Sequence, residues 1–201
     1  MDKKEEIMLA AIELAAEKGL GSVSLEQIAA KAGIKKPSLY NHFKSKSALI
    51  AALYEYLREN SKKVLPQSDM DISLIANAKS AYQVLYSAVS SYVKMCTQKD
   101  MFTFYKFLYS QRAVDPAAAA IMCEETNKMI NATKALFYAL CAHKLLTADD
   151  IDTAAVSFAM TIHAMTEHQY DKMLCGEDFS DEQIRSYIRW FCSALGGAEN
   201  E

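Results

Sequence analysis

The sequence has 201 residues, of which 51% are hydrophobic and 23% charged, with a net charge of −3. This composition is ordinary for a soluble globular protein and excludes wholesale disorder. The uncharged stretches fall short of the about 20 residues that a membrane-spanning helix needs, so we expect no membrane partner.

The N-terminus and the cysteines indicate a cytoplasmic protein. The charged start of the chain is unlike a signal peptide. The five cysteines are scattered and form no C-x-x-C pair. We therefore expect reduced, mostly buried thiols rather than a disulfide framework.

The first predicted helix covers residues 5–18, where apolar residues recur every three or four positions. A second helix is expected after Ser24, because Ser24 and Gln27 have the spacing of a capping box. It should end at Gly33, since glycine adopts the left-handed conformation that follows many helices.

A short third helix is expected to start near Pro37, a residue suited to the first turn of a helix. It should end before Lys44, and Ser45 should cap a fourth helix that runs to about residue 63. Two short helices joined by a glycine turn are typical of a helix-turn-helix, in which the second helix enters the major groove of DNA.

A helical wheel of the third helix places Leu39 and Phe43 on the face that packs against the first two helices. On the same wheel, the residues that point away from that core are Pro37, Ser38 and Asn41. Tyr40 and His42 lie at the two edges of the packed face, where each ring could turn inward or outward. Hydroxyl, amide and aromatic groups of this kind bind phosphates and base edges.

Charge is unevenly distributed along the chain. Residues 1–63 hold 11 Lys and Arg against 8 Asp and Glu, a net charge of +3, and residues 64–201 carry −6. Between Glu26 and Lys46 there are five lysines and one glutamate. A solvated charged face is the simpler interpretation of such a segment by itself, but local positive charge is also what DNA phosphates require.

Residues 7–53 resemble the TetR family of transcriptional regulators. The similarity is carried by S-L-E-Q-I-A at residues 24–29, A-G-I at 32–34 and P-S-L-Y-N-H-F-K-S-K at 37–46. The resemblance implies contacts to double-stranded operator DNA. The residues that face the bases would be Lys36, Pro37 and Ser38. The residues that bind the DNA backbone would be Tyr40, His42 and Lys46. Gln27 would be a further contact, in addition to the outward-facing Asn41.

Beyond a predicted boundary at residues 66–69, only helices are expected. The patterns predict helices over residues 72–96 and 102–112, a long helix from Pro116 to about residue 143, one from Thr147 to about residue 175, and a last one from Ser180 to residue 196. The sequence thus predicts an all-α protein. Residues 1–63 form a helix-turn-helix DNA-binding domain, and residues 64–201 form a larger helical domain for ligand binding and dimerisation.

Family resemblance implies a small-molecule effector of unknown identity and a homodimer. Aromatic and polar side chains of the middle helices are candidates for the effector site: Tyr86, Phe102, Tyr105, Tyr109, Met129, Phe137, Phe158 and His163. A regular apolar stripe on the last two helices is the candidate dimer contact: Phe158, Ile162, Ile184, Ile188, Phe191 and Leu195. The fourth helix is expected to be the only strong link between DNA-binding head and sensor.

An enzyme is not expected, because the sequence lacks a Gly-rich phosphate loop, a G-x-S-x-G motif and an H-E-x-x-H motif. No cofactor or metal is expected either, since His163 and His168 do not share a helix face and no cysteine pair is nearby. The leading interpretation is a repressor that a ligand releases from a palindromic operator. The alternative is a ligand-independent DNA-binding module of the nucleoid or division-factor type.

Overall fold

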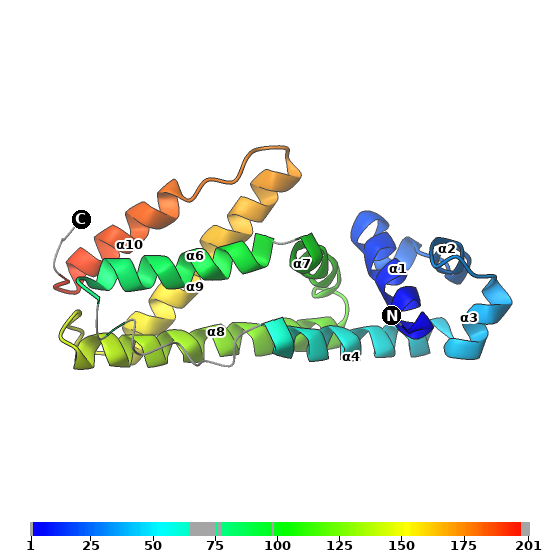
Figure 1. The fold of residues 1–201 in the computed structure, drawn as a ribbon, viewed down its shortest axis with the longest axis horizontal. Coiled ribbons are helices and arrows are strands. Elements are labelled where there is room, and N and C mark those ends of the chain that lie inside the picture. The colour runs from blue at the N-terminus through cyan, green and yellow to red at the C-terminus, as the bar shows by residue number, and fades with distance from the viewer. Residues whose placement is uncertain (1, 65–74, 76–77, 98, 198–201) are drawn as a thin grey trace. The chain divides into compact units, whose positions relative to one another are not determined.

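The computed structural model describes residues 2–64, 75, 78–97 and 99–197, and these are all helical or loop (Figure 1). The head contains α1 (Lys3–Lys18), the 3-10 turn η1 (Leu20–Ser22), α2 (Leu25–Lys31), α3 (Lys36–His42) and α4 (Lys46–Val64). The remaining helices are α6 (Ala81–Thr97), α7 (Lys99–Gln111), α8 (Pro116–Ala142), α9 (Ile151–Leu174) and α10 (Glu182–Ala194).

The all-α expectation is confirmed. The predicted boundary at residues 66–69 and the start of the helix predicted from residue 72 lie outside the described residues. The division of the chain at residue 63 therefore stays a prediction. The described residues group into two compact units, one from residues 2–64 and 95–125, the other from residues 75–94 and 126–197.

The first unit is built around the buried face of α1, where Ile7, Ala11 and Ala15 are 1% exposed or less. These side chains lie four residues apart, so that they share one face of the helix. That helix packs against α2 and α4, and also against α7, which comes from a distant part of the chain.

A hydrogen bond ties α4 to the start of α8 within the same unit. The Tyr54 hydroxyl donates to Asp115 Oδ2 over 2.7 Å, and Asp115 Oδ1 accepts from the backbone N–H of Ala117 over 2.9 Å. Burial, together with the Asp115 carboxylate, raises the pKa of Tyr54, so the hydroxyl stays a donor at neutral pH. The expectation that α4 is the only strong link from the head is wrong, because α7 also packs on α1.

The turn between α2 and α3 has the hydrogen bonds that its sequence predicts. Gly33 has φ +68°, and its N–H donates to the carbonyl of Ala30 over 3.1 Å. The N–H of Ile34 donates to the carbonyl of Ala29 over 2.9 Å. These two bonds are those of a Schellman motif, which ends α2 and redirects the chain into α3.

We expect Gly33→Ala to lower the free energy of unfolding of the head by about 1–2 kcal/mol, because a side chain at positive φ is strained. A Cβ at this position meets nothing within 4 Å, so backbone strain alone sets the loss. Gly21 is the matched control, since it also has open space but no positive φ. Urea unfolding should show Gly21→Ala to be neutral or mildly stabilising; equal losses in both variants would contradict this account.

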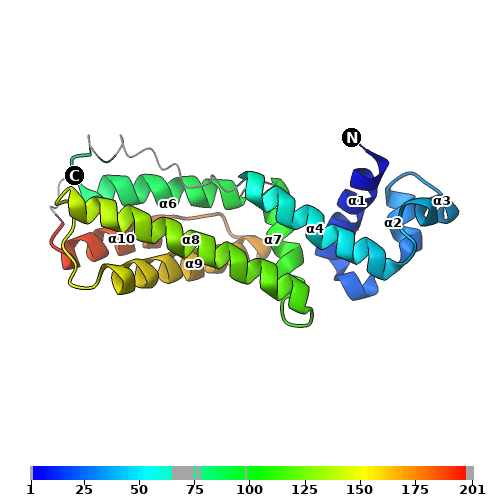
Figure 2. The same ribbon diagram turned by 90° about the horizontal axis from the view of Figure 1, so that it is seen from below.

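The second unit is a bundle of α6, α9, α10 and the later part of α8 (Figures 1 and 2). Its core contains Leu85 from α6, Phe137 from α8, Phe158 from α9 and Ile188 from α10. Ring centroids are 5.4 Å apart between Phe137 and Phe158, and 5.1 Å apart between Phe158 and Phe191. This aromatic cluster holds three of the helices together.

Two further details differ from expectation. The N-cap of α9 is Asp150 and not Thr147: the side chain of Asp150 accepts from the N–H of Thr153 over 2.9 Å. The expectation of mostly buried thiols is also wrong, because Cys123 and Cys175 are exposed. Burial raises the pKa of Cys192 to about 11, which keeps that thiol neutral.

Candidate nucleic-acid interface

Helix α3 is held by one fully buried side chain, Leu39, which is followed by the buried Phe43 just after the helix end. Both lie where the wheel places them. Its opposite side carries the exposed residues Lys36, Pro37, Ser38, Tyr40 and Asn41, and His42 is half-buried. Tyr40 is 45% exposed, so its ring lies on the outer edge of the helix. Helix α3 therefore presents hydroxyl, amide, aromatic and ammonium groups on a single surface, the groups that contact DNA.

Gln27 has a local structural role in addition to the predicted one. Its Oε1 accepts from the N–H of Ser24 over 2.8 Å, and its own N–H donates to Ser24 Oγ over 3.2 Å. The predicted capping box is thus present. Gln27 is an exposed residue in the first turn of α2.

Lys46 is also fixed in place by the fold. Its ammonium donates to the backbone carbonyl of Val23 over 2.6 Å, which connects the first residue of α4 to the loop before α2. The Ser45 hydroxyl accepts from the N–H of Ala48 over 3.1 Å, as the predicted cap requires.

One charged residue at this surface was missed from the sequence. Glu26 Oε2 lies 3.5 Å from Lys36 Nζ, and both side chains are largely in solvent. The only signal in the sequence was that Glu26 is the single acidic residue within the lysine-rich segment. Neighbouring Lys31 pairs with Glu13 of α1 at 2.8 Å, and the hydrogen bond that Lys31 donates to that carboxylate raises the pKa of Lys31.

The eight candidate effector residues are divided between the two units, with Phe102, Tyr105 and Tyr109 in the first and the other five in the second. Phe137 and Phe158 belong to the buried core of the bundle. The hydroxyl of Tyr86 donates to Asp181 Oδ2 over 2.9 Å, and His163 Nε2 lies 3.7 Å from Glu167 Oε1. Four further candidates lie on α7 and α8: Phe102, Tyr105, Tyr109 and Met129.

Two of the effector candidates, Tyr105 and Tyr109, lie near each other on α7. Their ring centroids lie 6.1 Å apart, and Tyr105 is 5% exposed. Burial raises the pKa of the Tyr105 phenol, with smaller contributions from Cys96 and Glu125.

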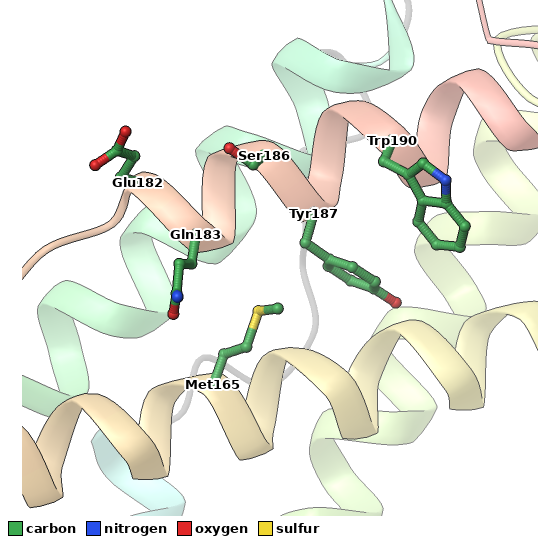
Figure 3. Close-up of a pocket in the computed structure, with 6 residues that line it drawn as sticks. All are labelled: Met165, Glu182, Gln183, Ser186, Tyr187 and Trp190. Atoms are coloured by element: carbon green, nitrogen blue, oxygen red, sulfur yellow. The ribbon is translucent and has the colours of Figure 1, made fainter.

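An open groove of about 670 Å³ lies between α9 and α10 (Figure 3). Met165 projects from α9 toward Gln183 and Tyr187 of α10, and Trp190 lies at one end. Trp190 is 65% exposed. None of the eight effector candidates lines this groove.

The apolar stripe predicted as the dimer contact faces inward. Phe158, Ile162, Ile184, Ile188 and Phe191 are 7% exposed or less and pack in the core of one chain, with Leu195 partly buried against it. A side chain that is buried in its own subunit cannot also form the contact with a second one. The stripe is therefore the core-facing side of α10, and any contact between subunits would use the outer side.

The described residues contain neither a helix long and apolar enough to cross a bilayer nor three His, Cys, Asp or Glu side chains grouped as metal ligands.

Comparisons with known proteins agree with the geometry of both parts. Residues 7–53 match the family described as bacterial regulatory proteins, tetR family. Residues 83–192, more than half of the chain, match the family described as AefR-like transcriptional repressor, C-terminal domain. The two matches cover the helix-turn-helix and most of the later helices.

Curated relatives are similar over shorter stretches. The chain is 38% identical over 82 residues to the tetracycline repressor protein class A from transposon 1721 of Escherichia coli, covering 39% of this chain and 38% of the repressor. It is 30% identical over 99 residues to the biofilm operon negative regulator IcaR of Staphylococcus aureus, covering 47% and 52%. The chain thus spans about half of these relatives or less.

Solved structures show the same fold over nearly the whole chain. A regulatory protein of the tetR family from Rhodococcus RHA1 has a TM-score of 0.66 at 20% identity, covering 99% of this chain and 100% of that one. The flavonoid-responsive regulator FrrA has a TM-score of 0.60 at 24% identity, covering 96% of each chain.

Proposed function

Because this chain belongs to the TetR family of bacterial regulatory proteins, we propose that it is a cytoplasmic repressor that binds an operator through α3 and leaves it when a small molecule binds. The family is one of transcriptional regulators; one relative is named a tetracycline repressor, and another, IcaR, a negative transcriptional regulator. No catalytic role is part of this proposal. Residues 1–63 would bind DNA, and residues 64–201 would sense the effector and form the dimer.

The exposed face of α3 carries this proposal. Leu39 anchors the helix while Ser38, Tyr40 and Asn41 remain exposed on a head with a net charge of +3. Lys36, Pro37 and Ser38 would contact base edges; Tyr40, His42 and Lys46 would contact phosphates, with Gln27 and Asn41 beside them. Phosphate contacts would supply most of the affinity, and base contacts the choice of site.

A gel-shift experiment tests the proposal directly. The probe is duplex DNA from upstream of the gene for this protein, with a shuffled duplex of the same composition as the control. Specific binding that a small-molecule panel reverses supports a ligand-controlled repressor. Specific binding that no compound changes supports the ligand-independent module, and equal affinity for both duplexes would contradict an operator-binding function.

We propose that the chain acts as a homodimer through the outer faces of α9 and α10. Met160 on α9 is 44% exposed and Trp190 on α10 is 65% exposed, which is unusual for large apolar side chains. The groove between the two helices is lined by Met165, Tyr187 and Trp190 (Figure 3). A two-fold axis there would match a palindromic operator.

Trp190→Glu is expected to convert the dimer into monomers, since it places two charges at the centre of the proposed contact. Tyr138→Glu is the matched control, because Tyr138 is 51% exposed but lies on α8. Sedimentation velocity at micromolar concentration gives the readout. A wild-type monomer, or a Trp190→Glu dimer, would contradict the proposed surface.

A further inference from the structure

The ion pair between α2 and α3 lies at the surface proposed to meet DNA. Lys36 is the first residue of α3, and Glu26 is the second residue of α2. Lys36 Nζ lies 3.5 Å from Glu26 Oε2, and the side chains are 45% and 75% exposed. Both charged groups are thus accessible and lie beside the exposed Pro37 and Ser38.

This pair is not explained by stability. Ion pairs in solvent contribute little to folding, and the separation of 3.5 Å is long for such a contact. The pair between Lys31 and Glu13 is shorter, at 2.8 Å, and already connects α2 to α1. A carboxylate near DNA also repels phosphates, so Glu26 would weaken non-specific binding unless it meets a donor.

The major-groove edge of a base pair can supply that donor. The edge of a G·C pair presents two adjacent acceptors, guanine N7 and O6, followed by the N4 amino group of cytosine. The Lys36 ammonium only donates hydrogen bonds and the Glu26 carboxylate only accepts them. A donor and an acceptor side by side therefore match this edge in order, with Lys36 on guanine and Glu26 on cytosine.

An A·T pair fits less well. Adenine offers the ammonium a single acceptor, N7, next to an amino group that repels it. The carboxylate could accept from that amino group, but it would then lie beside the O4 acceptor of thymine, which repels it. The charges of the pair thus favour G·C over A·T at the contacted position.

We propose that Lys36 and Glu26 together read one G·C base pair in each half of the operator, an inference that rests on the proposed operator-binding function. Glu26 is then a specificity-determining residue: it neutralises Lys36 in front of phosphates and accepts a hydrogen bond from the N4 amino group of cytosine. Non-specific DNA gains little from this pair, and the correct base pair gains two hydrogen-bonded contacts.

The experiment is selection of duplexes from a random library, followed by sequencing, with wild type, Glu26→Gln, Lys36→Gln and Glu13→Gln. Wild type should select a site with a conserved G·C pair in each half. Glu26→Gln and Lys36→Gln should each reduce the preference for that same pair by about tenfold or more, the usual scale for one base contact, and leave the other positions unchanged. Glu13→Gln should select the wild-type site.

Competition with random-sequence DNA adds a second readout. Glu26→Gln removes a negative charge that faces phosphates, so its non-specific affinity should rise, and that of Glu13→Gln should not. Far-UV circular dichroism and thermal melting establish that each variant is folded. If Glu26→Gln fails to fold, Lys36→Gln carries the test, because the same base pair must lose its preference.

The outcomes separate the two proposals. If Glu26→Gln keeps the wild-type preference at every position, or if it loses the preference at an A·T base pair instead, Lys36 and Glu26 do not recognise a G·C base pair. Either result leaves the proposed operator binding intact. A wild-type protein that selects no sequence overturns the proposed function itself.

Discussion

Phe137→Ala is expected to lower the free energy of unfolding by about 3–5 kcal/mol, the range for a large aromatic removed from a packed core. Phe137 is fully buried, and its ring centroid lies 5.4 Å from that of Phe158 and 5.9 Å from that of Phe191. The loss approaches the whole stability of many domains, so much of the variant should be unfolded at 37 °C.

The neighbouring Tyr138 provides the control, since it is 51% exposed on the same helix. Urea unfolding followed by circular dichroism should give a change within about 0.5 kcal/mol for Tyr138→Ala. If Phe137→Ala were also nearly neutral, Phe137 would not be part of the packed core. It would instead line a cavity that can collapse or fill with ligand, in agreement with its place among the effector candidates predicted from the sequence.

Lys46→Ala is expected to produce the largest loss of operator affinity among the head variants. It removes a proposed phosphate contact in both halves of the site, so the slope of log affinity against log salt should fall by about one unit per contact. It also removes the 2.6 Å bond to the carbonyl of Val23, which holds the start of α4. Binding should weaken for every DNA sequence alike, because phosphates carry no sequence information.

Lys134→Ala is the control of equal charge change, because Lys134 pairs with Asp152 in the bundle and not in the head. Fluorescence anisotropy over a salt series gives the slopes for the two variants. A Lys46→Ala protein with wild-type affinity at physiological salt would show that the ammonium serves the fold alone. Lys46→Arg should keep the positive charge and most of the affinity.

The head was predictable because its signals are local. Ser24 and Gln27 form the capping box that their spacing indicates, and Gly33 has the positive φ that its place after α2 requires. Each of these features depends on residues within one turn of the chain. A family resemblance then added roles for particular side chains, and those roles await the binding experiments.

Among the described residues, the positions of the later helices along the chain were predictable, but the direction of their faces was not. An apolar stripe such as Ile184, Ile188 and Phe191 fits the core of one chain and the contact between two chains equally well. Periodicity indicates that one face of a helix is buried, but it does not show whether the same chain or a second chain covers that face. Thr147 and Asp150 are both good capping residues three positions apart, so sequence alone could not choose between them.

The packing of α7 on α1 has a consequence for anyone who wishes to isolate the DNA-binding part. A gene fragment that stops after residue 64 encodes every residue of the helix-turn-helix, yet it lacks α7 and Asp115, the partners of α1 and Tyr54. Such a fragment exposes apolar surface to water that the full chain covers, and we expect it to aggregate or to need a fusion partner. We therefore expect the smallest stable DNA-binding fragment of this protein to need residues from two separate stretches of the chain, 2–64 and 95–125.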